Sequence, residues 1–117
     1  MPSDSIMIIA GEASGDVHGA KLANSIKHQS RDTFLFGVGG TAMKAEGVRI
    51  LVDIKTLSVM GITEVLAKLP SIYRALKTVK KALNRLKPNL VILIDFPDFN
   101  FHIAAAAKKL DIPVLYY

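Results

Sequence analysis

The chain contains no cysteine among its 117 residues. It therefore has neither a disulfide framework nor a zinc site built on thiolates. No apolar run approaches the roughly 20 residues of a membrane-spanning helix. The N-terminus also lacks the charged start and apolar core of a signal peptide. These absences predict a cytoplasmic protein whose membrane contact is at most peripheral.

Acidic residues are absent between Val65 and Ile94, although the formal net charge of the whole chain is only +5. The same segment holds seven basic residues: Lys68, Arg74, Lys77, Lys80, Lys81, Arg85 and Lys87. Tyr73 is its only aromatic residue, so it lacks the interleaved stacking set of a nucleic-acid surface. We expect an anionic membrane surface or a phosphorylated ligand as the partner, and no nucleic acid.

Short apolar runs alternate with helix-like segments along the chain. The strands are predicted at 6–10, 33–38, 48–52, 89–95 and 112–117, and the helices at 15–28, 41–46, 61–69, 71–87 and 99–110. Near-continuous apolar strands that alternate with helices predict an α/β fold, with a doubly wound, Rossmann-like parallel sheet covered on both faces. We expect one domain over 1–117. Because the chain stops on an apolar strand with no helix to cover it, we also expect that a longer protein continues beyond it.

Pro70 divides the predicted helical region in two. The spacing indicates a short helix from about Gly61 that Pro70 interrupts, followed by a longer amphipathic helix that Pro88 ends. The longer helix carries an apolar stripe that should pack on the sheet, formed by Ile72, Leu76, Val79, Leu83 and Leu86.

The turn after the first strand is rich in small and acidic residues. Gly11 and Gly15 allow a sharp turn and a close approach of the backbone to a ligand, and Ser14 or Asp16 is expected to cap the following helix. In a parallel sheet this turn lies at the edge where ligands bind. We expect the functional site to begin here.

Several common site motifs do not fit. Residues 37–42 match a loose dinucleotide fingerprint, but they follow the second strand and lack the acidic residue about 20 positions later. Ser14 has no flanking glycines two positions away, so it is not a nucleophile elbow. His18, His28 and His102 show no metal-ligand spacing, and a Walker loop is absent. We therefore predict no metal and no cofactor.

Four carboxylates follow the first and fourth strands: Glu12, Asp16, Asp95 and Asp98. The ends of parallel strands meet at one edge of a sheet, so these groups are expected to converge on one cleft. Spacing leaves two readings open. The carboxylates are catalytic, or Asp95 bonds the backbone of its turn and Asp98 only caps a helix.

Five motifs taken together are more specific. They occupy residues 10–16, 37–40 with Met43 and Gly47, 59–66, 95–100 and 116–117. In order and spacing they resemble the lipid-A-disaccharide synthase family. The resemblance implies a GT-B glycosyltransferase with two Rossmann-like domains, the first mainly for the acceptor and the second for the UDP-sugar. This chain resembles part of the first domain.

The resemblance implies transfer of 2,3-diacylglucosamine from UDP to the 6-hydroxyl of 2,3-diacylglucosamine 1-phosphate (lipid X), with inversion. Asp98 matches the family's Pro-Asp-Phe-Asn aspartate and is the candidate base, and Glu12 would orient a substrate hydroxyl or the base. The expected substrate-binding positions are Gly11, Ser14, Gly15, Asp16, Gly39, Gly40, Met60, Gly61 and Asn100. Among these, Gly11, Ser14, Gly15, Gly39 and Gly40 would line the cleft through backbone N–H groups. The alternative is a non-catalytic acceptor-binding or membrane-docking fragment.

The short helix before Pro70 also carries an apolar stripe, formed by Ile62, Val65, Leu66 and Leu69. The basic segment begins at its end. An apolar wedge flanked by cations is the pattern of a helix lying at a membrane interface. We expect these four side chains to contact the cytoplasmic face of an anionic inner membrane, where the acylated substrates reside. The alternative is that the stripe packs into the core.

Overall fold

The computed structural model describes residues 4–57 and 62–117, and for 62–68 and 97 it describes the backbone only. Within these residues, five strands form one parallel sheet in the order β3-β2-β1-β4-β5. The elements are β1 Ser5–Ala10, α1 Ala13–Gln29, β2 Phe34–Gly39, α2 Thr41–Ala45, β3 Arg49–Asp53, a 3₁₀ turn Ile54–Thr56, α3 Ile62–Leu86, β4 Leu90–Ile94, α4 Pro97–Lys109 and β5 Val114–Tyr116.

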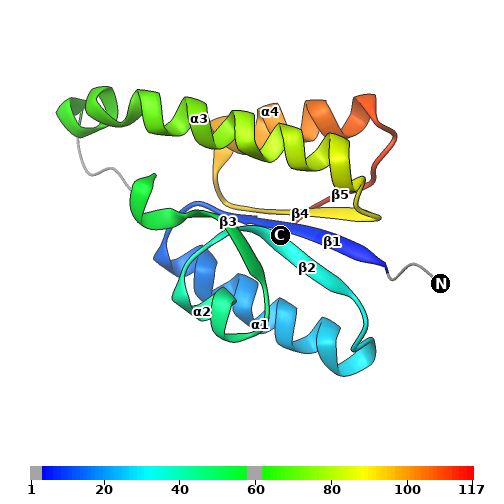
Figure 1. The fold of residues 1–117 in the computed structure, drawn as a ribbon. Coiled ribbons are helices and arrows are strands. Elements are labelled where there is room, and N and C mark those ends of the chain that lie inside the picture. The colour runs from blue at the N-terminus through cyan, green and yellow to red at the C-terminus, as the bar shows by residue number, and fades with distance from the viewer. Residues whose placement is uncertain (1–3, 58–61) are drawn as a thin grey trace.

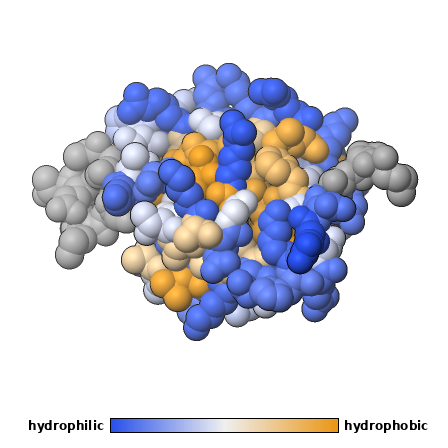
Figure 2. Space-filling model, turned by 60° about the horizontal axis from the view of Figure 1, so that its bottom comes forward, coloured by the Kyte–Doolittle hydropathy of each residue, from blue (hydrophilic) through white to orange (hydrophobic). Residues whose placement is uncertain are grey.

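Helices cover both faces of the sheet, as predicted (Figure 1). The helices α1 and α2 lie on one face, and α3 and α4 lie on the other. Figure 2 brings the α1 and α2 side forward and shows apolar residues near the middle of this view, with hydrophilic residues around them. The doubly wound α/β arrangement is confirmed.

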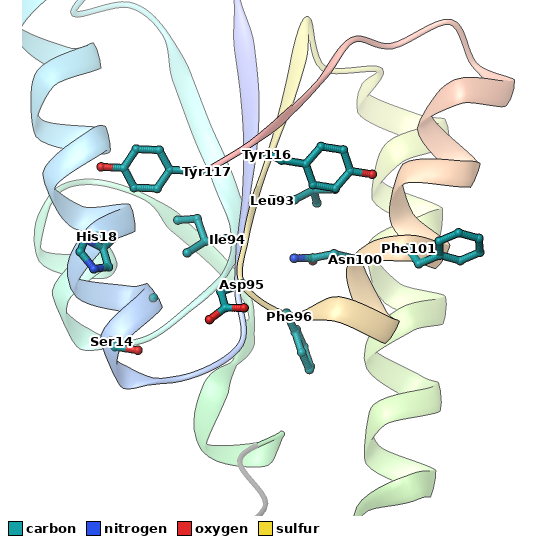
Figure 3. Close-up of a pocket in the computed structure, with 11 residues that line it drawn as sticks. Ser14, His18, Leu93, Ile94, Asp95, Phe96, Asn100, Phe101, Tyr116 and Tyr117 are labelled. Atoms are coloured by element: carbon teal, nitrogen blue, oxygen red, sulfur yellow. The ribbon is translucent and has the colours of Figure 1, made fainter.

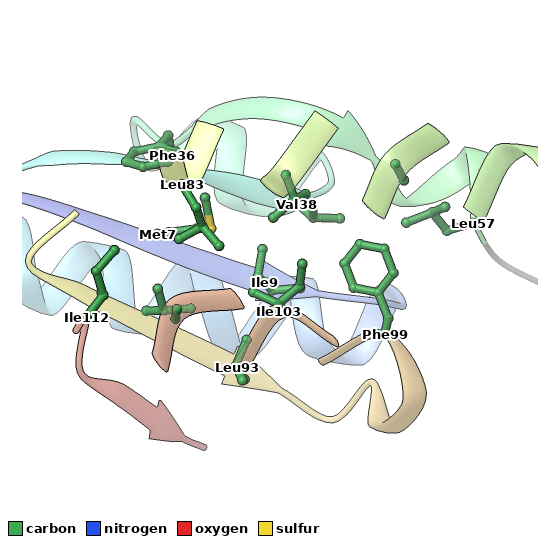
Figure 4. Packing of buried hydrophobic residues seen from close by; sticks show 14 of the residues in the cluster. Met7, Ile9, Phe36, Val38, Leu57, Leu83, Leu93, Phe99, Ile103 and Ile112 are labelled. Atoms are coloured by element: carbon green, nitrogen blue, oxygen red, sulfur yellow. The ribbon is translucent and has the colours of Figure 1, made fainter. Parts of the chain in front are cut away.

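The central strand β1 divides the core into two layers. Met7 and Ile9 point toward α3 and α4, whereas Ile8 and Ala10 point toward α1 and α2, and all four are fully buried. This alternation is the two-residue period of a strand, and both faces are apolar because helices cover both. Figure 4 shows the α3 and α4 layer, where Leu83 and other large apolar side chains pack on the sheet.

The prediction that Pro70 interrupts the helix is wrong, because α3 runs unbroken from Ile62 to Leu86. A proline inside a helix removes one backbone hydrogen bond and crowds the preceding turn. After Pro70, however, Ala75, Val79 and Leu83 recur every four residues and are all buried against the sheet. This packing outweighs the local cost, since tertiary burial supplies most helical stability in proteins. Of the predicted stripe, Val79 and Leu83 are buried and Ile72 and Leu76 pack against the same core, but Leu86 is 43% exposed.

The predicted helix caps are also wrong. Glu12 occupies the N-cap position of α1, so Ser14 and Asp16 lie inside the helix rather than before it. Phe96 is the N-cap of α4 and Pro97 its first residue, which places Asp98 in the first turn. Neither cap forms a side-chain hydrogen bond. Proline is favoured at the first helical position because it has no N–H to leave unpaired there, and this shifts the start of α4 ahead of Asp98.

Candidate functional site

The loops that follow β1 and β4 lie next to each other. These strands are neighbours, with Ala10 in register with Ile94 at their carboxyl ends. From there the chain leaves β1 toward α1 on one face and leaves β4 toward α4 on the other (Figure 1). This is the topological switch point of the sheet, and open α/β sheets bind their ligands in the crevice outside it.

Gly11 and Phe96 bring the two loops into contact. A β-carbon at position 11 would lie 2.5 to 2.9 Å from atoms of the Phe96 ring. The Phe96 ring is stacked on Phe99 with ring centroids 4.7 Å apart, and Phe99 is buried in the core. Glycine is therefore required at position 11 for this close approach, and the aromatic pair holds the second loop in place.

A cavity of about 620 Å³ opens at this end of the sheet. Figure 3 shows its lining on both sides of β4, with Ser14 and His18 from α1 and Asn100 and Phe101 from α4. The other lining residues are Gly15, Leu93, Ile94, Asp95, Phe96, Tyr116 and Tyr117. Its size is within the range of small-molecule sites.

Asn100 presents an unsatisfied polar atom in this cavity. The residue is only 4% exposed, and its Oδ1 has no hydrogen-bond partner among the residues that the structure describes. Its side chain points from α4 toward β4 (Figure 3). An unpaired buried carbonyl costs on the order of 1–3 kcal/mol, so a site that keeps one is prepared for a donor from elsewhere.

The carboxylates of Glu12, Asp95 and Asp98 are exposed at this edge. Within 4–57 and 62–117, none of the three side chains forms a hydrogen bond or ion pair with another described residue. Among the described residues, Asp95 therefore forms no hydrogen bond with the backbone of its turn, and Asp98 forms no capping hydrogen bond with α4. Asp95 lines the cavity and has a φ of 24°, a left-handed conformation that is costly for a residue with a side chain.

Asp16 differs from the other three because it is buried and fully engaged. Its Oδ1 accepts hydrogen bonds from the backbone N–H groups of Gly40 at 2.7 Å and Met43 at 3.0 Å, and its Oδ2 accepts one from Ala42 at 3.0 Å. These donors are at the start of α2, so Asp16 caps a helix that follows it by more than twenty residues. Its carboxylate thus fixes α2 against α1.

Gly39 and Gly40 are expected from the sequence to offer backbone N–H groups to a cleft. The N–H of Gly40 instead donates to Asp16, which contradicts that expectation for Gly40. A β-carbon at Gly39 would lie 2.4 Å from Sδ of Met43, and one at Gly40 would lie 2.9 Å from Oδ2 of Asp16. Both glycines therefore serve the close packing of α1, α2 and β2, and neither lines the 620 Å³ cavity.

The remaining predicted positions fall near the start of α3. Met60 and Gly61 lie outside the described residues, as do the side chains of Ile62, Val65 and Leu66. Leu69 is described, and 49% of it is exposed.

Sequence reasoning missed several aromatic residues that line the cavity. His18 lies one turn after Ser14 on α1, and its ring makes an edge contact with Tyr117 at a centroid distance of 6.1 Å. Phe101 and Tyr116 are among the most exposed large hydrophobic residues described. The helical spacing of Ser14 and His18 was the available signal, but the contribution of Tyr116 and Tyr117 depends on β5 pairing with β4.

A family model described as lipid-A-disaccharide synthetase matches residues 6–117. This match covers nearly the whole chain. The chain belongs to this family. Its members with similar sequence include the lipid-A-disaccharide synthase of Myxococcus xanthus, 46% identical over 112 residues, and that of Syntrophus aciditrophicus, 45% identical over 117 residues. These matches cover 96% and 100% of the chain, but only 29% and 30% of the two relatives.

Solved structures of other families share the fold. The C-terminal domain of the PF1911 hydrogenase from Pyrococcus furiosus matches with a TM-score of 0.70 at 17% identity, covering 100% of this chain and 95% of that one. MurG from Acinetobacter baumannii matches with a TM-score of 0.60 at 22% identity, covering 97% of this chain and 34% of that one. A UGT transferase from Siraitia grosvenorii gives 0.63 at 13% identity over 98% and 28% of the two chains. The Rossmann-like fold is confirmed, and it is shared with part of the MurG and UGT transferase chains.

Two other features are absent from the described part of the chain. No helix there is long and apolar enough to cross a membrane. No group of three or more histidine, aspartate or glutamate side chains there is arranged to hold a metal ion.

Proposed function

We propose that the full native protein containing this chain is a glycosyltransferase that builds the lipid A disaccharide. It transfers 2,3-diacylglucosamine from UDP to the 6-hydroxyl of 2,3-diacylglucosamine 1-phosphate and releases UDP. The family match over residues 6–117 carries the proposal. Since the chain spans about 30% of the curated relatives, the complete reaction is assigned to the full protein rather than to these residues alone.

The proposed chemistry is a direct displacement. A base removes the proton from the 6-hydroxyl while its oxygen attacks the anomeric carbon, and the bond to UDP breaks from the opposite side with UDP as the leaving group. An α-linked donor thus gives a β-linked product. General base assistance of this kind contributes typically ~10²–10⁴-fold to the rate.

Asp98 is the proposed base. Its carboxylate is exposed in the first turn of α4, beside the switch-point crevice, and it has no partner among the described residues. The carboxylate is therefore available to a substrate hydroxyl. Asp95 is the competing candidate, because it lines the cavity directly.

Glu12 and Asn100 are proposed to orient the acceptor. Glu12 follows β1 at the same crevice, where an exposed carboxylate can accept a hydrogen bond from a sugar hydroxyl. Asn100 Oδ1 is buried and has no partner within 4–57 and 62–117, so a substrate hydroxyl or amide N–H would satisfy it. Ser14 and Gly15 complete this side of the cavity.

The proposed membrane contact is the start of α3, through Ile62, Val65, Leu66 and Leu69. Leu69 is 49% exposed, and Tyr73, one helical turn later, is 66% exposed. Two large apolar side chains on one face of a helix suit insertion at an interface. The basic residues that follow on α3 would attract anionic lipid headgroups.

The base is tested by steady-state turnover of the full native protein at saturating acceptor. Asp98→Ala should lower kcat by at least about 100-fold, whereas Asp95→Ala should lower it much less. Asp32→Ala is the matched control, because Asp32 is an exposed carboxylate in the loop before β2, at the opposite end of the sheet. A loss below about tenfold for Asp98→Ala, worth ~1.4 kcal/mol, would reject Asp98 as the base.

The membrane contact is tested by replacing Val65, Leu66 and Leu69 together with Ser. Vesicle sedimentation should fall while the melting temperature stays unchanged. A loss of several kcal/mol of stability would instead mean that these side chains are buried in the core.

A further inference from the structure

A second cavity, of about 460 Å³, lies on the α3 side of the sheet at the opposite end from the candidate site. Phe34 and Arg49, the first residues of β2 and β3, line it together with the C-terminal half of α3. A six-residue strand is ~20 Å long, so this groove is separated from the switch-point crevice by about the length of the sheet. The proposed transfer reaction makes no use of it.

Three cations from two elements converge on this groove. Arg49 belongs to β3, while Lys81 and Arg85 are four residues apart on α3 and share one helix face. Their side chains have no ion-pair or hydrogen-bond partner in the described part of the chain. No acidic residue of the described part of the chain lines the groove. Three unpaired like charges around one cavity make it complementary to an anion.

The interior of the same groove is apolar. The rings of Phe34 and Phe36 are stacked with centroids 5.3 Å apart and planes at 22°. Phe36 is fully buried, but Phe34 is 39% exposed and Leu86 is 43% exposed. Leu51 adds a half-buried aliphatic surface from β3. A free phosphate ion would leave this surface in water, and a neutral hydrocarbon would leave the cations unpaired.

We infer that this groove binds a single anionic phospholipid. The phosphodiester lies between Arg49, Lys81 and Arg85, and the beginning of an acyl chain lies over Phe34, Phe36 and Leu86. The volume is within the range of small-molecule sites, which suits a headgroup with part of one chain. This inference is independent of the proposed transferase reaction and of the proposed wedge at the start of α3.

The test uses the full native protein and lipids dispersed as monomers, so that no bilayer is present. Dihexanoyl-phosphatidylglycerol is titrated below its micelle concentration by calorimetry, beside dihexanoyl-phosphatidylcholine and inorganic phosphate. The anionic lipid should bind at least about tenfold more tightly than either, because only it combines a net negative charge with acyl chains. Equal affinity for phosphatidylcholine, or for inorganic phosphate, would overturn the inference.

Variants locate the binding. Replacing Arg49, Lys81 and Arg85 with Gln should weaken binding of the anionic lipid by about tenfold or more. The matched control replaces Lys77, Lys108 and Lys109 with Gln, which removes the same charge from exposed positions outside the groove. The control should change affinity less than about twofold. Equal losses in both variants would mean that net charge, and not the groove, attracts the lipid.

Chemical footprinting of the wild-type protein tests the groove even if the triple variant fails to fold. Reductive methylation followed by mass spectrometry should show that the anionic lipid protects Lys81 but not Lys77. Protection of Lys81 by raising the protein concentration without lipid would assign the groove to a second copy of the chain. The Ser variant of Val65, Leu66 and Leu69 should still bind monomeric lipid. The proposed membrane contact at the start of α3 and the proposed lipid binding in the groove can therefore be rejected separately.

Discussion

Asp16 on α1 accepts a 2.7 Å hydrogen bond from the backbone N–H of Gly40, the residue immediately before α2. Together with the bonds from Ala42 and Met43, this contact satisfies N–H groups that a five-residue helix cannot pair internally. A side chain from one helix therefore acts as the N-terminal cap of another. The glycines at 39 and 40 leave the space for this carboxylate.

The first prediction is that Asp16→Ala lowers the free energy of unfolding by about 2–4 kcal/mol. Hydrogen bonds to a charged group are worth roughly 1.5–3 kcal/mol each, but they are not additive, and the loss also leaves buried N–H groups unpaired. Urea denaturation measures the change. Asp32→Ala serves as the control, since its exposed carboxylate should contribute less than about 0.5 kcal/mol. A similar stability for both variants would contradict the capping role.

The second prediction concerns the contact between Gly11 and Phe96. Gly11→Ala should destabilise the protein by about 1–3 kcal/mol, because the new methyl group overlaps the Phe96 ring. In a Phe96→Ala background the same substitution should cost little. A double-mutant cycle by thermal denaturation gives the coupling between the two positions. Additive effects would mean that the ring moves aside freely and does not fix the β4-α4 loop.

The third prediction is that Pro70→Ala stabilises the protein by about 1–3 kcal/mol. The helix α3 continues through this position, so an alanine restores the missing backbone hydrogen bond and removes the ring from the preceding turn. Lys77→Ala, at an exposed position later in α3, should stay within about 0.5 kcal/mol of the wild type. A destabilised Pro70→Ala protein would show that the proline is required by the native helix geometry.

The elements that were predictable from sequence are those whose pattern is local. All five strands were placed within two residues of their observed ends, because their apolar runs are short and bounded by polar or glycine residues. The fold class followed from the alternation of these strands with helices. The approach of the turns after the first and fourth strands also followed from parallel-sheet geometry.

The features that were missed depend on partners far away in the sequence. Asp16 was expected to cap its own helix, but its donors lie 24 to 27 residues later. The effect of Pro70 was decided by burial of α3 against the sheet, and not by the local propensity of the proline. The buried, unpaired carbonyl of Asn100 emerged only once α4 was packed beside β4. The same holds for the phospholipid groove, whose cations come from β3 and α3.

The fourth prediction is that residues 1–117 alone do not bind the UDP-sugar donor. The family resemblance assigns the donor mainly to a second domain, and the chain spans about 30% of its curated relatives. Thermal denaturation with and without added UDP measures this, because a ligand at 100 times its Kd stabilises a protein by about 2.7 kcal/mol. We expect no change in the melting temperature, and a clear UDP-dependent rise would place a donor site within these residues.

The last prediction concerns the unpaired carbonyl of Asn100. Asn100→Asp keeps the size of the side chain but replaces its amide NH₂ with a second oxygen, whereas Asn100→Leu removes the acceptor and fills the space with apolar atoms. If Oδ1 accepts a hydrogen bond from the acceptor sugar, Asn100→Leu should raise the KM for that substrate by about tenfold, equivalent to ~1.4 kcal/mol. The same variant should be at least as stable as the wild type, because it removes a buried polar atom that has no hydrogen-bond partner among the described residues. Asn84→Leu is a suitable control, since Asn84 is an exposed amide on α3 that bonds the backbone oxygen of Lys80. Steady-state kinetics and urea denaturation of the full native protein measure both quantities. Lower stability with an unchanged KM would show that Asn100 serves the packing of α4 and does not touch the substrate.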